Sequence, residues 1–126
     1  MKYFVLAALL ATLPMTALAH GIAPAAQHGG SVAETTGEHW VELVLRGTEM
    51  TVYVSDDANK PIASARLGGK ATVLVGGKSQ QVALLPAAAN SLTGKLDPGA
   101  AGKVISAVTL TVDGKSAQVR FTTTQP

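Results

Sequence analysis

The chain has 126 residues, with 10 Lys and Arg against 8 Asp and Glu, a formal net charge of +2. These charges form no basic cluster, which argues against nucleic-acid binding. The sequence contains no cysteine, which excludes disulfides, cysteine zinc sites and thiolate copper sites.

The first 19 residues have the pattern of a secretory signal peptide. Lys2 provides the positive start, Phe4 to Leu13 form an apolar segment, and Ala17 to Ala19 form a small-x-small cleavage site. The apolar segment is too short to span a bilayer, and no other segment qualifies. We expect an exported, periplasmic protein without a membrane span after cleavage. The mature chain would then begin at His20.

Residues 20–30 are rich in Gly, Ala and Pro and show no periodicity, which predicts a flexible arm. The remainder, residues 31–126, reads as one β domain with a turn every eight to twelve residues. We expect strands over 32–35, 40–46, 49–55, 70–75, 80–85, 91–96, 103–112 and 115–123, and a weak edge strand over 62–67. Asp113-Gly114 indicates a type I′ hairpin turn.

This spacing predicts an all-β fold, a small immunoglobulin-like β-sandwich of about 7–9 antiparallel strands. A small closed barrel is the alternative. Aromatic residues make up only 4% of the chain, so we expect a thin core of Val, Leu and Ala. We expect no helix after the signal peptide.

All three histidines, His20, His28 and His39, fall within the first twenty residues of the expected mature chain. Imidazole is the commonest side-chain metal ligand. Cleavage after Ala19 would also give His20 a free α-amine, a second donor that forms a chelate with its ring. The spacings suit an arm that folds back onto a strand edge, with Gly29-Gly30 providing the bend.

The histidines therefore predict a metal site, in which Glu42 is a candidate fourth ligand or an orienting partner of a ligand. Imidazole and amine ligands suit Cu(II) first, and Zn(II) closely behind. For each histidine the alternative is an ordinary role: a frayed terminus for His20, a solvated loop for His28, and packing or capping for His39. Glu34, Glu38, Asp56 and Asp57 are further acidic candidates.

The motifs of common enzyme classes are missing from the sequence. We find no Gly-x-Ser-x-Gly, phosphate-loop or His-Glu-x-x-His pattern. The sequences Gly68-Gly69-Lys70 and Gly76-Gly77-Lys78 lead into no helix, so they indicate turns and not phosphate-binding loops. We therefore expect a protein that is not an enzyme.

An ordered set of short motifs resembles a known family. His28-Gly29-Gly30 is followed by the segments Trp40–Val44 and Thr51–Val54 and by Lys60-Pro61. This set resembles the His-Gly-Gly β-sandwich module of periplasmic heavy-metal efflux adaptor subunits and its free-standing exported relatives. The resemblance implies a periplasmic role in handling copper, zinc, cadmium or silver, and by position it singles out His28 and Glu42. The Ala19-His20-Gly21 junction is also similar to exported copper proteins whose mature terminus is histidine.

Two hypotheses follow from the sequence. In the first, the chain is a periplasmic Cu(II)- or Zn(II)-binding protein that buffers metal or hands it to an efflux component. In the second, it is a non-catalytic interaction module whose exposed edge strand, near 62–67, docks on a partner protein and whose histidines are incidental.

Overall fold

The computed structural model describes residues 22–99 and 102–125, and the expected signal peptide and His20 lie outside this part of the chain. Eight antiparallel strands form one continuous sheet in the order β1-β2-β3-β6-β5-β4-β7-β8. The strands are β1 (Ser31–Glu34), β2 (Trp40–Arg46), β3 (Glu49–Ser55), β4 (Leu67–Val75), β5 (Lys78–Pro86), β6 (Ser91–Lys95), β7 (Gly102–Val112) and β8 (Lys115–Gln125).

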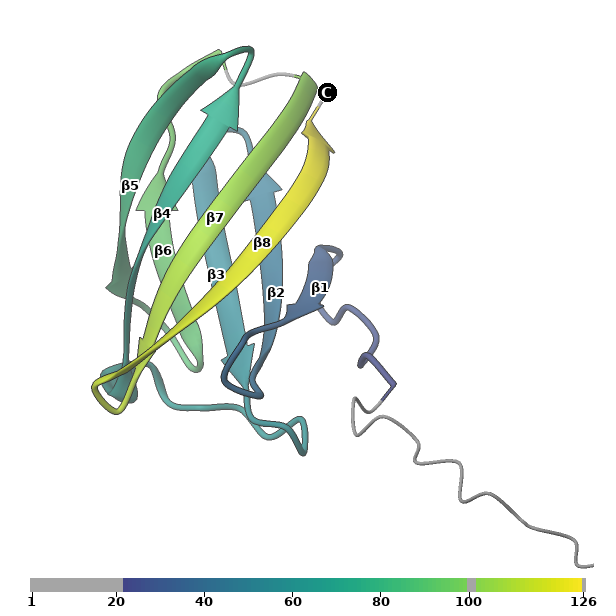
Figure 1. Cartoon of the computed structure of the whole chain (residues 1–126), viewed down its shortest axis with the longest axis vertical. Helices are drawn as coiled ribbons and strands as arrows, with labels where there is room; N and C mark the ends of the chain where they lie inside the picture. The colour runs from purple at the N-terminus through teal and green to yellow at the C-terminus, as the bar shows by residue number, and fades with distance from the viewer. Residues whose placement is uncertain (1–21, 100–101, 126) are drawn as a thin grey trace, which may run out of the picture.

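The sheet folds over into two facing layers, as Figure 1 shows. One layer contains β1, β2, β3 and β6, and the other contains β5, β4, β7 and β8. The end of β5 joins them, because Leu85 and Pro86 pair with β6 while the rest of the strand pairs with β4. The prediction of an all-β, sandwich-like domain with seven to nine antiparallel strands is confirmed.

The two ends of the sheet nearly close the structure into a barrel. Thr36, just after β1, donates its backbone N–H to the carbonyl oxygen of Gln118 in β8 over 3.1 Å. The N–H of Gln118 returns a hydrogen bond to the Thr36 hydroxyl over 3.2 Å. The structure thus combines two-layer packing with much of the closure expected of the alternative, a small barrel.

Alternation of apolar and polar residues fixes which side of each strand faces the core. In β7, Val104, Val108, Leu110 and Val112 are buried, as the sequence pattern predicts. In β2 and β3 the inward side chains are Val41, Leu43, Met50, Val52 and Val54, all at most 2% exposed. Apart from Phe121 and Met50, the core cluster is aliphatic, in keeping with the low aromatic content.

The predicted turns form with the expected backbone chemistry. Asp113 and Gly114 both have positive φ, 50° and 80°, which is the signature of a type I′ turn. The carboxylate of Asp56 accepts hydrogen bonds from the N–H groups of Ala58 and Lys60. These local bonds end β3 and begin the long crossing to the other layer.

The expected edge strand over 62–67 is wrong. Ile62 donates its N–H to the carbonyl of Val54 and is only 4% exposed. Its side chain therefore packs in the core. A short 3₁₀ helix, η1 (Ser64–Arg66), follows. Within the described residues, no helix is long and apolar enough to cross a membrane.

Candidate metal-binding site around His28 and Glu42

Glu42 is an acid on the outer surface of β2, yet it is only 7% exposed. Its neighbours Val41 and Leu43 point into the core, so the alternation of the strand directs Glu42 outward. The arm segment Gln27–Gly30 lies over it and hides it from solvent. A buried carboxylate is costly unless it is hydrogen-bonded, so its partners decide whether this arrangement is stable.

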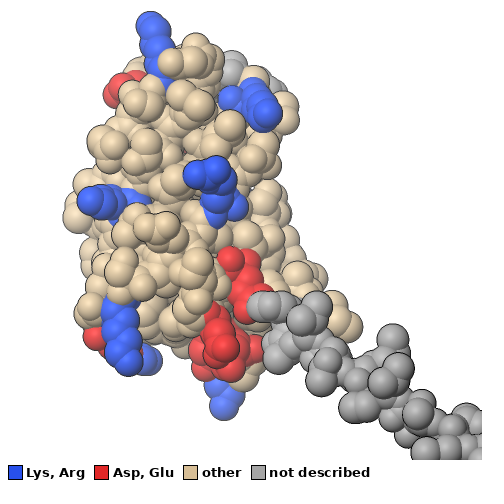
Figure 2. All heavy atoms as spheres, viewed as in Figure 1, with Lys and Arg blue, Asp and Glu red and all other residues tan. Residues whose placement is uncertain are grey.

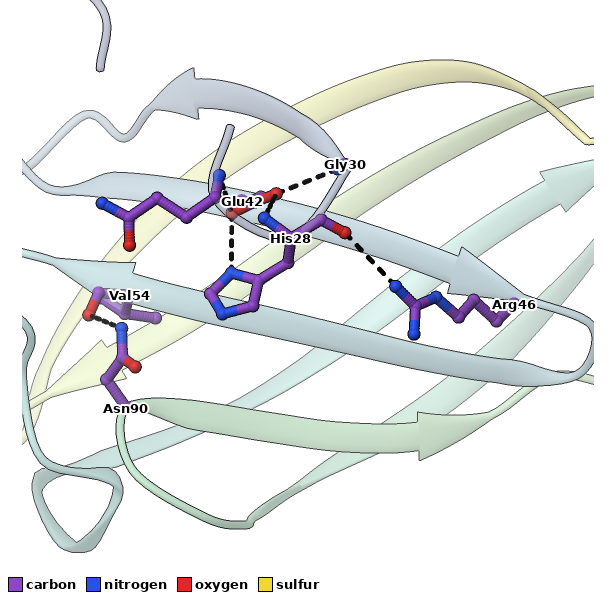
Figure 3. Close-up of polar contacts among 7 residues, drawn as sticks. His28, Gly30, Glu42, Arg46, Val54 and Asn90 are labelled. Carbon is purple, nitrogen blue, oxygen red and sulfur yellow. Dashed lines mark hydrogen bonds and ion pairs between the residues drawn. The ribbon is translucent and has the colours of Figure 1, made fainter. Parts of the chain in front are cut away.

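Both carboxylate oxygens of Glu42 accept two hydrogen bonds from the arm (Figure 3). Oε1 accepts from the N–H of Gln27 (3.1 Å) and contacts Nδ1 of His28 (2.9 Å). Oε2 accepts from the N–H groups of His28 and Gly30, each over 2.9 Å. One side chain thereby satisfies three backbone donors of the arm, which has no strand partner there.

The ring of His28 also stacks on Tyr53 of β3. The two ring centroids are 3.6 Å apart and the planes differ by 1°. Tyr53 lies directly opposite Glu42 in the β2–β3 register. His28 thus bonds to one member of this cross-strand pair and stacks on the other, which fixes both its position and its ring plane.

Two glycines allow the arm to approach β2 so closely. Gly29 has a φ of 73°, a backbone conformation that favours glycine. A Cβ atom on Gly30 would lie 2.2 Å from the carbonyl oxygen of Leu43, which no side chain tolerates. The sequence His28-Gly29-Gly30 therefore has a physical reason: one residue binds the Glu42–Tyr53 pair, one turns, and one fits against the strand.

The pKa of Glu42 lies below its ordinary value of 4.5. Burial acts in the opposite direction and is the largest single influence, because it penalises the charged form. The hydrogen bonds from the His28 ring and from the N–H groups of Gly30, His28 and Gln27 together outweigh it. Glu42 is therefore an anion at neutral pH.

An ionised carboxylate only accepts hydrogen bonds, so Nδ1 of His28 must carry the proton in this contact. In the neutral ring the lone pair then lies on Nε2, for which the described residues provide no hydrogen bond. The side chain of His28 is 37% exposed, so the ring is partly open to solvent. This is the arrangement typical of metal-binding histidines, whose other nitrogen donates to a carboxylate.

A cavity of about 30 Å³ lies beside the ring, between the arm and the sheet. Trp40, Tyr53, Asn59 and Asn90 are among its lining residues, and Figure 3 shows the Asn90 amide turned toward the carbonyl of Val54. Pockets for organic ligands are usually about ten times larger. The space is of a size that suits a water molecule or an ion.

His39 does not join this site, and His20 lies outside the described residues. Among residues 22–99 and 102–125, no group of three or more His, Asp or Glu side chains is placed to hold a metal. His39 lies in the β1–β2 loop, where its N–H bonds to the hydroxyl of Thr35 over 3.1 Å. It is close enough to Asp113, in the β7–β8 turn, to help lower the pKa of that carboxyl, after the larger effect of Arg66.

Glu42 was a candidate ligand or orienting partner, and its geometry matches the orienting role because both oxygens are already occupied by the arm. Sequence reasoning did not single out Tyr53 as a site residue. The signal was available, since the two-residue connection at Gly47-Thr48 fixes the hairpin register and places Tyr53 opposite Glu42.

Comparison of the chain with known protein families, with curated proteins and with solved structures finds no match.

Proposed function

We propose that this chain is an exported, non-enzymatic protein that binds a divalent transition-metal ion, Cu(II) or Zn(II), with His28 as its anchoring ligand. The observation that carries the proposal is the hydrogen bond from Nδ1 of His28 to Glu42, which leaves Nε2 free. The stack on Tyr53 holds the ring in one orientation. A ligand fixed before metal arrives loses less conformational freedom on binding.

A single imidazole is a weak site, so further donors are needed. His20 is the first candidate, because an N-terminal histidine supplies an amine and a ring together. His20 lies eight positions before His28, and a chain of that length reaches up to about 27 Å, which is long enough for His20 to return to the ring. An amine and two imidazoles favour Cu(II) in the usual affinity order, with Zn(II) next.

The expected role is metal buffering or hand-over to a periplasmic efflux component. Its support is the resemblance to efflux-adaptor modules. Two of the three residues of the His-Gly-Gly motif, His28 and Gly30, bond to Glu42, and Gln27 just before the motif does so as well. A partly exposed ring also suits exchange of metal with a partner better than an enclosed site does.

The test is a Cu(II) and Zn(II) titration of the processed protein, purified from the exported fraction with its first residue established by mass. We expect uptake of one ion, with quenching of Trp40 fluorescence by Cu(II), because Trp40 and His28 line the same cavity. His28→Ala should abolish uptake, and Glu42→Gln should weaken it at least tenfold.

His39→Ala is the matched control, since it removes an imidazole that lies outside the site. It should leave metal affinity unchanged. A one-residue extension before His20 then tests the amine separately. If the processed protein takes up no stoichiometric metal, or if His28→Ala binds as tightly as the parent, the proposal fails. An interaction module would then remain as a hypothesis, but without the docking strand expected at 62–67, where the structure has the 3₁₀ helix η1.

A further inference from the structure

Asn90 lines the same cavity as His28, and two hydrogen bonds hold it to one residue of β3. Its backbone carbonyl accepts the N–H of Val54 over 3.0 Å. Its side-chain nitrogen, Nδ2, donates to the Val54 carbonyl over 2.9 Å. A carbonyl oxygen accepts hydrogen bonds and donates none, so the group that faces Val54 must be the NH₂ and not the oxygen of the amide. The orientation of the carboxamide is therefore fixed.

This arrangement leaves the side-chain oxygen of Asn90, Oδ1, with free lone pairs. In the part of the chain that the structure describes, the bond from Nδ2 is the one hydrogen bond of this side chain. In Figure 3 the His28 ring extends from Glu42 toward β3, the strand that Asn90 contacts, with Nε2 on the edge away from Glu42. Two atoms with free lone pairs, Nε2 and Oδ1, thus belong to residues that line one small cavity.

Two consecutive residues of β3 set the positions of both groups. The Tyr53 ring stacks on His28 with the centroids 3.6 Å apart, and the backbone of Val54 binds Asn90. Val54 is itself fixed, because its side chain is 0% exposed and its carbonyl also accepts the N–H of Ile62 over 3.1 Å. Both donors are therefore in place before an ion arrives, which reduces the loss of conformational freedom on binding.

Acidic side chains gather at the end of the molecule where this cavity lies. Figure 1 shows β3 ending at the lower end, and Figure 2, in the same view, shows most of the visible acidic groups there. Strand ends and loops at this end contain five acids against three bases: Glu34, Glu38, Asp56, Asp57 and Asp113 against Lys60, Arg66 and Lys115. An excess of acids raises the local concentration of cations.

We infer that Oδ1 of Asn90 is a second ligand of the divalent ion that His28 binds, an inference that rests on the proposed function. An amide oxygen adds a neutral donor to the imidazole nitrogen, a combination that suits Cu(II) and Zn(II). Soft Cu(I) instead selects thiolate and thioether sulfur, so it gains little from an amide oxygen. Asn90 thereby gives the site a preference for divalent copper or zinc over Cu(I).

The experiment is a competition titration of the processed protein with Cu(II), Zn(II) and, under reducing conditions, Cu(I). Asn90→Ala should weaken Cu(II) and Zn(II) binding at least about tenfold and should change Cu(I) binding less than about twofold. The difference between the ions separates a ligand from a support, because a substitution that only disturbed the loop would weaken the binding of all three. Zn(II) should also shift the ¹³C resonance of the Asn90 carboxamide carbon in the parent protein.

Asn59→Gly is the matched control, since it removes the other carboxamide that lines the cavity near Asn90. Asn59 is exposed, its side chain makes no hydrogen bond within the described residues, and its φ of 60° suits glycine. Its metal affinities should equal those of the parent. If Asn90→Ala keeps the parent affinity for Cu(II) and Zn(II), or loses equal affinity for all three ions, the inference is overturned while the proposed function stands. Uptake by His28→Ala as tight as by the parent contradicts the proposed function itself.

Discussion

Nδ1 of His28 lies 2.9 Å from Oε1 of Glu42, and this contact joins an irregular segment to the outer surface of the sheet. The segment has no ladder of its own there, because β1 begins only at Ser31. Its backbone donors are satisfied by one side chain instead. Stability of the arm and accessibility of Nε2 therefore depend on the same carboxylate.

Glu42→Gln should destabilise the protein by about 1–3 kcal/mol. The new NH₂ group would replace an oxygen that accepts hydrogen bonds from the arm, so it would face N–H groups that it cannot bond to. The loss should be confined to the arm, so the amides of Gln27, His28 and Gly30 should exchange faster than those of β7. Urea denaturation and hydrogen exchange measure both effects. The control is Glu49→Gln, a change at an exposed residue at the start of β3, which should alter stability by less than about 0.5 kcal/mol. Equal losses in the two variants would contradict the assigned role.

Gly30→Ala should release the arm, because its Cβ would meet the Leu43 carbonyl oxygen at 2.2 Å and the Val44 side chain at 2.9 Å. We expect a loss of about 1–3 kcal/mol, within the range for overpacking. Gly29→Ala is the comparison: it strains a positive φ but meets no atom within 4 Å, and should cost about 1 kcal/mol. Thermal denaturation of both variants shows which one loses more stability. A larger loss for Gly29→Ala would contradict the tight contact inferred between Gly30 and the backbone of Leu43.

The stabilisation from Glu42 should depend on pH in a defined direction. Its folded pKa is below the ordinary 4.5, so the folded state favours the ionised carboxylate. The contribution is therefore fully present above the unfolded pKa and is lost as pH falls through the lowered folded value. The difference in unfolding free energy between the parent and Glu42→Gln, measured from pH 7 to 3, should be constant at first and then shrink. A difference that grows on acidification would refute the direction of the shift.

Most of the fold was predictable because alternation and turn chemistry agree along the chain. The hairpin from Trp40 to Ser55 and the long strands ending at Val112 and beginning at Lys115 follow from period-two patterns around short turns. The segment 62–67 misled because both of its ends, Ile62 and Leu67, are apolar. Their side chains do enter the core, but the backbone between them turns as η1.

The candidate site was only half predictable. A glutamate between Val41 and Leu43 has to face outward, and the register places it opposite Tyr53. What no periodic pattern reveals is that residues 27–30 return to cover it. That placement depends on hydrogen bonds to one carboxylate and on the missing Cβ of Gly30, which are tertiary contacts without a sequence period.

A buried serine in β7 gives a test of the core itself. Ser106 is 0% exposed, and its hydroxyl has no hydrogen-bond partner within the described part of the chain. Ser106→Ala should therefore be neutral or stabilise the protein by about 1 kcal/mol, since an unsatisfied buried group is removed. Ser91→Ala is the matched control, because the Ser91 hydroxyl donates to the Ala88 carbonyl over 2.6 Å. Ser91→Ala should destabilise the protein. Urea denaturation of both variants measures the two effects, and a larger loss for Ser106→Ala than for Ser91→Ala would contradict the prediction.

The tautomer of His28 connects the arm contact to metal binding, and it can be observed directly. Since ionised Glu42 only accepts hydrogen bonds, the neutral ring should be the Nδ1–H form, a form that ¹⁵N NMR of the imidazole distinguishes from the commoner Nε2–H form. Zn(II), which is diamagnetic, should shift Nε2 while the Nδ1 proton and the slow exchange of the Gly30 amide persist. His39 should not respond. Coordination through Nδ1 would instead break the contact with Glu42 and expose the arm, and that outcome would overturn the proposed role of the carboxylate as the group that orients the ligand.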